Sequence, residues 1–175
     1  LHERGMLGSA VLYFNRDYKT DGHPFYPSET WEPHSMASIS THDLPTAAGF
    51  LKAENVRVRA GLGLVKDVDG EYERAAGERK DLVDFLVKEG VLASPDVPDE
   101  DIVIAMHAVL TRAHSALRLT SPLDALGADR QPNLPGTEDE YPNWRIPLPV
   151  PLESLFSHVN VQKVVKALSR DTNAG

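Results

Sequence analysis

The sequence predicts an α/β fold that is predominantly helical and contains about three short strands. Short apolar runs that stop at polar residues alternate with longer segments in which apolar residues recur at helical spacing. Three runs are expected to be strands: Val11-Leu12-Tyr13-Phe14, Met36 to Ser40, and Leu117 to Thr120. The chain has 175 residues, 41% of them hydrophobic, which is enough to bury one core. We therefore expect residues 1–175 to form a single unit.

Two helices are expected between residues 41 and 90. The first begins near Leu44-Pro45 with Thr41 or Asp43 as its cap and reaches about Lys52 or beyond, because proline is tolerated in a first turn. The second carries an apolar stripe from Tyr72 to Val87 and ends at Gly90.

Three further helices and a long loop are expected towards the C-terminus. Acidic residues 99–101 open a helix whose continuation, Ile102 to Ala116, is apolar almost all round, which predicts deep burial. A short helix follows Ser121-Pro122 and ends at Gly127, and a last one spans Leu152 to Leu168. The proline-rich stretch between them, Gln131 to Pro151, predicts irregular structure.

Composition excludes several classes of function. A formal net charge of −8 without a basic cluster opposes binding to nucleic acid. The absence of cysteine excludes disulfides and thiolate metal sites and agrees with a reducing compartment, so we expect a cytoplasmic protein. No apolar run approaches the roughly 20 residues that cross a bilayer. We expect neither a nucleic acid nor a membrane as partner.

The dipeptide His42-Asp43 places an acid beside an imidazole where a strand is expected to give way to a helix. Parallel α/β folds hold catalytic groups at such junctions. In one interpretation, Asp43 stabilises positive charge at a sugar anomeric carbon while His42 donates a hydrogen bond to a sugar hydroxyl. In the other, the dipeptide is only a helix cap next to a surface histidine.

A second candidate cluster lies in the irregular stretch: Asn133-Leu134-Pro135-Gly136-Thr137 and Asn143-Trp144-Arg145. Asn133 is suited to hydrogen bonds with sugar hydroxyls, and Trp144 and Arg145 are suited to supporting the loop. The alternative is an ordinary packed loop with a structural tryptophan, and sequence spacing does not separate the two.

Other motifs are incomplete. His107 and His114 are seven residues apart, whereas helical metal pairs are four apart, so we expect no metal site. The segment Gly61-Leu62-Gly63 lacks the Lys-Ser/Thr ending of a phosphate loop. No Gly-x-Ser-x-Gly elbow is present for a serine nucleophile.

Four motifs in order resemble the C-terminal part of bacterial 4-α-glucanotransferases, the amylomaltases or disproportionating enzymes. They are Arg4-Gly5-Met6-Leu7-Gly8 leading into Val11 to Phe14, then Ser40-Thr41-His42-Asp43-Leu44-Pro45-Thr46, then the two motifs that begin at Asn133 and Asn143. The resemblance is strong over residues 4–50 and 117–146 and only general elsewhere.

The resemblance implies the C-terminal part of a (β/α)₈ barrel of the α-amylase clan. It implies transfer of α-1,4-glucan segments through a covalent glucosyl-enzyme with retention of configuration, without a cofactor or metal. It identifies Asp43 as the third catalytic carboxylate, His42 as its substrate-binding neighbour, and Asn133 as a residue bordering the glucan cleft.

The family's nucleophilic Asp and acid/base Glu are expected upstream of Leu1. Two-carboxylate glycosyl transfer needs both groups, so we predict that this chain by itself is inactive. A partial barrel would leave strand edges unpaired, and a homodimer is one way to cover them.

A non-catalytic helical module is the alternative from another class. It would bind carbohydrate or protein through the aromatic loop containing Phe25, Tyr26 and Trp31.

Overall fold

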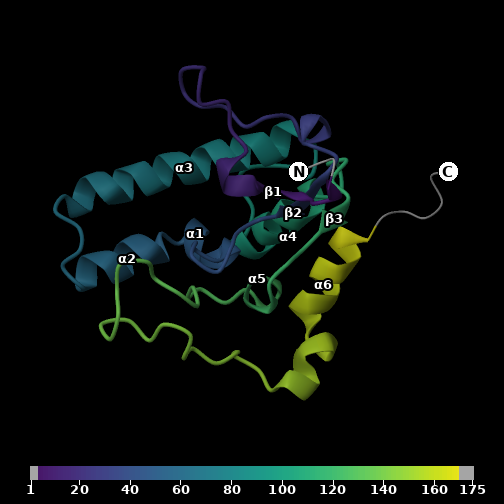
Figure 1. Ribbon diagram of the computed structural model, residues 1–175. Coiled ribbons are helices and arrows are strands. Elements are labelled where there is room, and N and C mark those ends of the chain that lie inside the picture. Colours follow the sequence, from purple (N-terminus) through teal and green to yellow (C-terminus); the bar gives the residue numbers. More distant parts are fainter. Residues whose placement is uncertain (1–3, 170–175) are drawn as a thin grey trace.

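The computed structural model describes residues 4–169 and contains a three-stranded parallel sheet in the order β1-β2-β3 (Figure 1). Strand β1 spans Gly8–Val11, β2 spans Ser35–Ser38 and β3 spans Leu117–Arg118. Ala10 pairs with Ala37, and Ala37 pairs with Arg118. Parallel strands joined by helix-containing connections confirm the predicted α/β class.

Over residues 4–169 the chain also contains six α-helices, which leave one face of the sheet open. They are α1 (Ala47–Leu51), α2 (Glu54–Gly61), α3 (Val68–Lys88), α4 (Asp99–Val109), α5 (Pro122–Leu126) and α6 (Val159–Leu168). Short 3₁₀ segments occupy Leu12–Phe14, Ser28–Thr30 and Leu152–Ser157. Helices α2 and α3 lie side by side and extend beyond the sheet (Figure 1). The chain between α5 and α6 runs along the side of the molecule away from α3 (Figure 1). None of the helices within residues 4–169 has the length and apolarity to cross a membrane.

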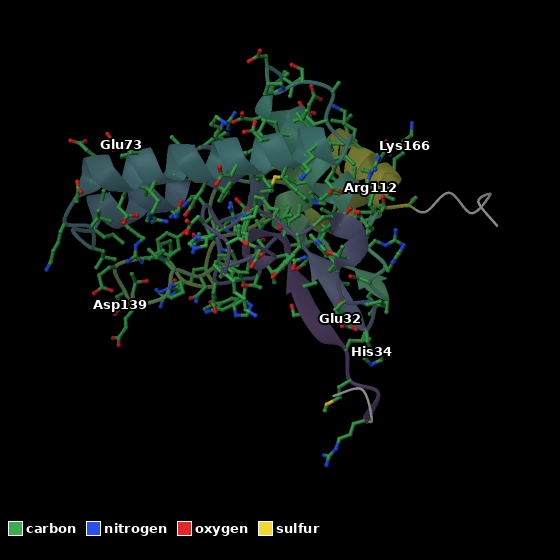
Figure 2. All side chains as sticks on the ribbon, turned by 90° about the horizontal axis from the view of Figure 1, so that it is seen from above. Glu32, His34, Glu73, Arg112, Asp139 and Lys166 are labelled. Atoms are coloured by element: carbon green, nitrogen blue, oxygen red, sulfur yellow. The ribbon has the colours of Figure 1, made fainter. Side chains whose placement is uncertain are left out.

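The main core lies between one face of the sheet and the helices. Along the β2 segment, Ser35, Ala37 and Ile39 are buried whereas Met36 and Ser38 are only half-buried, the alternation of a strand with one covered face. The buried face packs with Leu82 and Leu86 of α3, Ile102 and Met106 of α4, and Leu51 of α1. Charged side chains such as Glu73 and Lys166 lie on the outside of the helices (Figure 2).

The opposite face of the sheet is less covered. Register aligns Ser9, Met36 and Leu117 across the three strands. Ser9 is exposed, Met36 is half-buried, and Leu117 is 48% exposed. The molecule therefore carries an open sheet face with apolar side chains on it.

The first predicted strand was placed too late in the chain. The ladder to β2 uses residues 8–11, and Leu12–Phe14 form a 3₁₀ turn in which Leu12 is fully buried. Gly8, Ser9 and Ala10 have little strand propensity of their own, so pairing with β2 decides their conformation. The second strand likewise begins at Ser35 and ends at Ser38, slightly earlier than predicted.

Helix ends marked by local signals were predicted well. Gly90, with φ +67°, follows α3, and Gly127, with φ +71°, ends α5 in the left-handed conformation that favours glycine. Ser121 caps α5 by accepting a hydrogen bond from the Asp124 amide. The acidic first turn of α4 and its deep burial are also confirmed.

Two helices are shorter than predicted. Helix α4 ends at Val109 instead of Ala116, because the following residues turn to meet the start of β2: Ser115 is buried against Ser35 (Oγ–Oγ 2.8 Å), and the Ala116 amide donates to the Pro33 carbonyl. The last predicted helix is divided at His158 into a 3₁₀ segment and α6. His158 caps α6, because its Nδ1 accepts a hydrogen bond from the Asn160 amide.

Candidate functional site

The turn between β2 and α1 carries His42 and Asp43. The helix cap predicted at Thr41 or Asp43 is in fact Thr46, whose Oγ1 accepts from the Gly49 amide at 3.1 Å. Pro45 explains the shift, because a residue before proline is disfavoured in the helical region, so Leu44 cannot belong to the helix. His42 and Asp43 are therefore free of helix capping and lie in a turn beyond the carboxyl end of β2.

Asp43 meets Asn133 across the site. Asn133 Nδ2 donates a 2.6 Å hydrogen bond to Asp43 Oδ1. Because the strands are parallel, the segments that follow β2 and β3 emerge at the same edge of the sheet, which brings these two residues together. Two residues singled out from separate sequence motifs thus share one site.

Gln131 supports this contact and was missed by sequence reasoning. Its Nε2 lies 2.6 Å from the Asn133 carbonyl oxygen and 3.4 Å from the Asp43 carbonyl oxygen, and its own carbonyl accepts from the Tyr141 hydroxyl at 2.7 Å. Gln131 is buried, with 6% of its surface exposed. Its only sequence signal is its place two residues before Asn133.

His42 lies between Asp43 and Trp144. Its Nε2 is 3.4 Å from Asp43 Oδ2, and its ring centroid is 5.3 Å from that of Trp144. The side chains of His42 and Asp43 are 60% and 45% exposed, so both reach solvent. Trp144 is 65% exposed and has φ +61°, a backbone conformation that non-glycine residues rarely adopt.

The loop that carries Asn133 and Trp144 is held by Asn143. Asn143 Oδ1 accepts from the Leu134 amide at 2.8 Å, and its Nδ2 donates to Thr137 Oγ1 at 2.9 Å. The Trp144 amide donates to the Pro132 carbonyl. The role of Asn143 in closing the loop depends on contacts with Leu134 and Thr137, which the sequence motif alone does not predict.

Arg145 lies at the surface of the same loop. Its Nη2 is 3.7 Å from Asp139 Oδ1, and both side chains are largely exposed. A surface ion pair of this kind contributes at most about 1 kcal/mol. Support of the loop by Arg145 stays a prediction.

Of the two histidines considered as a metal pair, His114 is exposed and His107 is held by hydrogen bonds. His107 is fully buried, with Nδ1 2.8 Å from the Val103 carbonyl oxygen and Nε2 2.8 Å from Thr120 Oγ1. Because a carbonyl only accepts, we assign the proton to Nδ1. Over residues 4–169 there is no group of three or more His, Asp or Glu side chains arranged to hold a metal ion.

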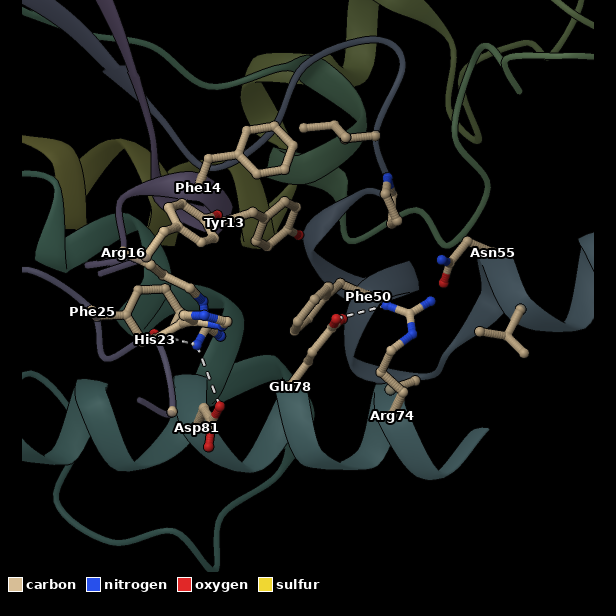
Figure 3. Close-up of a pocket in the computed structure, with 16 residues that line it drawn as sticks. Tyr13, Phe14, Arg16, His23, Phe25, Phe50, Asn55, Arg74, Glu78 and Asp81 are labelled. Atoms are coloured by element: carbon tan, nitrogen blue, oxygen red, sulfur yellow. Dashed lines mark hydrogen bonds and ion pairs between the residues drawn. The ribbon is translucent and has the colours of Figure 1, made fainter. Parts of the chain in front are cut away.

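A cavity of about 490 Å³ lies near the turn, and neither His42 nor Asp43 lines it (Figure 3). Leu44 and Pro45 border it on one side and α3 on the other. The ion pair between Arg16 and Asp81 closes part of its wall, with the Arg16 guanidinium 3.8 Å from the centre of the Phe25 ring. The polar groups suited to chemistry lie instead at the exposed edge formed by Asp43, Asn133 and His42.

A carboxylate, an amide and an imidazole thus converge at the carboxyl edge of a parallel sheet. Such an arrangement can stabilise a developing positive charge and hydrogen-bond the hydroxyls around it. The class of protein is therefore α/β, with this edge as the candidate site for a polar, hydroxyl-rich ligand.

The chain belongs to the 4-alpha-glucanotransferase family, whose sequence pattern it matches over residues 1–153. It is 38% identical over 181 aligned positions to the 4-alpha-glucanotransferase of Mycobacterium tuberculosis H37Rv, covering 98% of this chain and 25% of that protein. The Haemophilus influenzae 4-alpha-glucanotransferase is 28% identical over 169 positions, and the alignment covers 90% of this chain and 23% of that protein. The chain therefore spans about a quarter of the length of these relatives.

Solved structures agree. The amylomaltase from Corynebacterium glutamicum superposes with a TM-score of 0.88 at 28% identity, covering 98% of this chain and 26% of that one. The amylomaltase from Streptococcus agalactiae, solved in complex with acarbose, gives a TM-score of 0.56 at 14% identity, and the superposition covers 97% of this chain and 28% of that one. At this identity the comparison shows a similar fold alone.

Proposed function

We propose that this chain supplies one catalytic carboxylate and its neighbours to an active site that transfers α-1,4-glucan segments between maltooligosaccharides with retention of configuration. The observation that carries this proposal is the 2.6 Å hydrogen bond from Asn133 to Asp43 at a solvent-open edge, in a chain of the 4-alpha-glucanotransferase family.

Each residue has a separate role in the proposed site. Asp43 stabilises the positive charge that develops on the sugar ring as the glycosidic bond breaks. His42 donates a hydrogen bond to a sugar hydroxyl, and Asn133 holds the Asp43 carboxylate while bordering the glucan. Trp144, in contact with the His42 ring, supports that ring from the loop, and Arg145 supports the loop itself.

The chemistry needs two further groups. In the first step a nucleophilic carboxylate attacks the anomeric carbon while an acid protonates the leaving oxygen. In the second step the deprotonated acid acts as a base and activates the acceptor hydroxyl. We propose that both are supplied by the rest of a protein of the length of the relatives. The substrate is an α-1,4-glucan, no cofactor or metal takes part, and the location is the cytoplasm.

We infer that residues 1–175 act as one unit and that the parallel sheet is part of a (β/α)₈ barrel. The open face with Met36 and Leu117 would then face the barrel interior, and strands from the rest of the protein would pair with the edges of β1 and β3. In the isolated chain, homodimerisation is the proposed alternative for covering these edges.

The test uses the longer protein that contains this chain. Asp43→Asn keeps the shape of the side chain but removes its charge, and we expect kcat for glucose release from maltotriose to fall about 10²- to 10³-fold. Asp84→Asn, a matched change at an exposed carboxylate on α3, is expected to leave the rate unchanged. Transfer at the original rate by Asp43→Asn would refute the proposal.

The alternative of a binding module that uses Phe25, Tyr26 and Trp31 finds little support in the positions of these rings. Trp31 is 2% exposed, and Phe25 stacks on Phe85 with ring centroids 4.8 Å apart. Only Tyr26, at 41% exposure, offers an open ring. The loop is part of the core packing, and hydrophobic burial accounts for its aromatic content.

A further inference from the structure

Asp124 is a carboxylate that no motif marked as functional. It lies on α5 and is 3% exposed, which makes it the only acidic side chain among residues 4–169 that is buried. A carboxylate removed from water is costly unless hydrogen bonds satisfy it. Its hydrogen-bond donors therefore indicate what this position does.

Three donors surround the carboxylate, and none is a cation. Oδ2 accepts from Ser121 Oγ at 2.8 Å, within its own helix cap, and from Ser40 Oγ at 3.0 Å. Oδ1 accepts from the Ala47 amide at 2.7 Å. Ser40 follows β2, and Ala47 is the first residue of α1.

One carboxylate thus holds both ends of the turn formed by residues 41–46. Inside the turn, the Leu44 amide donates to the Thr41 carbonyl at 3.2 Å and the Asp43 amide lies 3.4 Å from Thr41 Oγ1, which are long hydrogen bonds. The conformation of the turn therefore depends strongly on how its ends are fixed.

The chain that follows Asp124 holds the same turn at further points. Thr46 Oγ1 donates to the Ala128 carbonyl at 2.6 Å, and Asn133 reaches Asp43. Asp124 is thus the buried beginning of a segment that binds both flanks of the turn and contacts Asp43 and Thr46 within it.

We propose that Asp124 is a positioning residue for the site: by binding Ser40 and Ala47 it fixes the turn that presents His42 and Asp43. This inference rests on the proposed function. Asp124 is buried beneath the turn and acts only through it, so it touches no substrate. A displacement of the turn of about 1 Å is enough to cost about 10²-fold in rate.

The first test is Asp124→Asn in the longer protein. The amide keeps one acceptor oxygen, but its NH₂ group cannot accept from the Ser40 and Ser121 hydroxyls. We expect kcat per folded molecule for glucose release from maltotriose to fall about 10- to 100-fold, with a smaller change in KM. Val83→Ala, at a buried core position on α3, serves as a control that lowers the melting temperature without touching the turn.

Ser40→Ala is a milder second variant in case Asp124→Asn fails to fold. It removes one of the two ties to the turn and leaves the carboxylate in place. We expect a several-fold fall in kcat, and the double variant Ser40→Ala/Asp124→Asn should lose less than the product of the two single losses.

A structural readout separates this inference from the proposed function. The ¹⁹F NMR signal of 5-fluorotryptophan at Trp144, assigned with Trp144→Phe, should be sensitive to the position of the adjacent His42 ring, whose centroid is 5.3 Å from that of Trp144. Asp124→Asn should change the chemical shift of this signal, whereas Val83→Ala should not.

The outcomes are distinct. Rate losses in Asp124→Asn and Ser40→Ala no larger than in Val83→Ala, with an unchanged Trp144 signal, would overturn the positioning role. If the longer protein transfers no glucan, or Asp43→Asn is fully active, the proposed function fails, and the Trp144 signal still decides whether Asp124 sets the turn.

Discussion

Asn133 donates a 2.6 Å hydrogen bond to the carboxylate of Asp43, a residue 90 positions earlier in the chain. The bond joins the turn after β2 to the loop after α5, and both side chains face solvent at the same edge of the sheet. A charge-assisted bond of this kind restricts the carboxylate to one orientation. The relationship leads to the first prediction.

Asn133→Ala should lower kcat of the longer protein about tenfold, because a hydrogen bond to a charged group contributes about 1.5–3 kcal/mol and solvent screening reduces this at a half-exposed site. Asn133→Asp should lose more, because it places a second negative charge against Asp43. Glucose release from maltotriose measures both. Asn160→Ala, on α6, is the control, and equal rates for all three variants would contradict the role given to Asn133.

A pair of glycine substitutions tests the packing under the turn. A Cβ at Gly49 would lie 2.2 Å from the Asp129 carbonyl oxygen and 2.8 Å from Thr46 Oγ1, so Gly49→Ala should lower the free energy of unfolding by about 1–3 kcal/mol. Gly77, inside α3, has open space around it, and Gly77→Ala should raise stability by about 0.5–1 kcal/mol. Denaturant unfolding of the 175-residue chain measures both, and a stabilisation of similar size at the two positions would show that the neighbours of Gly49 make room for the added Cβ.

His107 makes stability depend on pH. Burial lowers its pKa below the ordinary 6.5, against the smaller raising effects of the Val103 carbonyl and the Asp124 charge. In the unfolded chain the histidine binds a proton near 6.5, so below this pH the unfolded state takes up more protons than the folded state. The contribution of His107 to the free energy of unfolding should thus be constant above about pH 6.5. It should fall as the pH drops from 6.5 towards the lower pKa that His107 has in the folded chain.

His107→Gln removes the titrating group and provides the comparison. Its free energy of unfolding should be lower at pH 7, because the bonds to Val103 and Thr120 are weakened, but it should fall less steeply between about pH 6.5 and 5. Parallel pH curves for the two proteins would exclude His107 as the source of the dependence.

Trp144 should report glucan binding. It is 65% exposed and lies against His42, whereas Trp31 is 2% exposed in the core. Titration of the longer protein with maltooligosaccharides should give a saturable change in tryptophan fluorescence that Trp144→Phe removes, because a change of solvent at an exposed indole alters its emission. A change that persists in Trp144→Phe would place the glucan elsewhere.

Local chemistry allowed several features to be predicted. Gly90 and Gly127 marked helix ends through their need for positive φ, and the acidic first turn and apolar continuation of α4 predicted a buried helix. The cap at Ser121 follows the same short-range rules. These rules involve residues within one turn of each other, so the sequence contains all that they require.

Long-range packing decided the rest. Residues 8–10 form a strand only because β2 lies beside them, and α4 ends early because Ser115 must meet Ser35. Pro45 carried a local signal for the late start of α1, but the partners that fix Thr46 lie in the segment after α5.

The sequence by itself determined the α/β class, the helix ends at Gly90 and Gly127, and the residue types at the candidate site, including His42, Asp43 and Asn133. Only the tertiary structure decided that Asn133 touches Asp43, that Gln131 supports them, and that Asp124 lies beneath the turn. The physical reason is that parallel strands collect distant segments at one edge of a sheet, and which side chains then meet depends on register and packing across the whole chain.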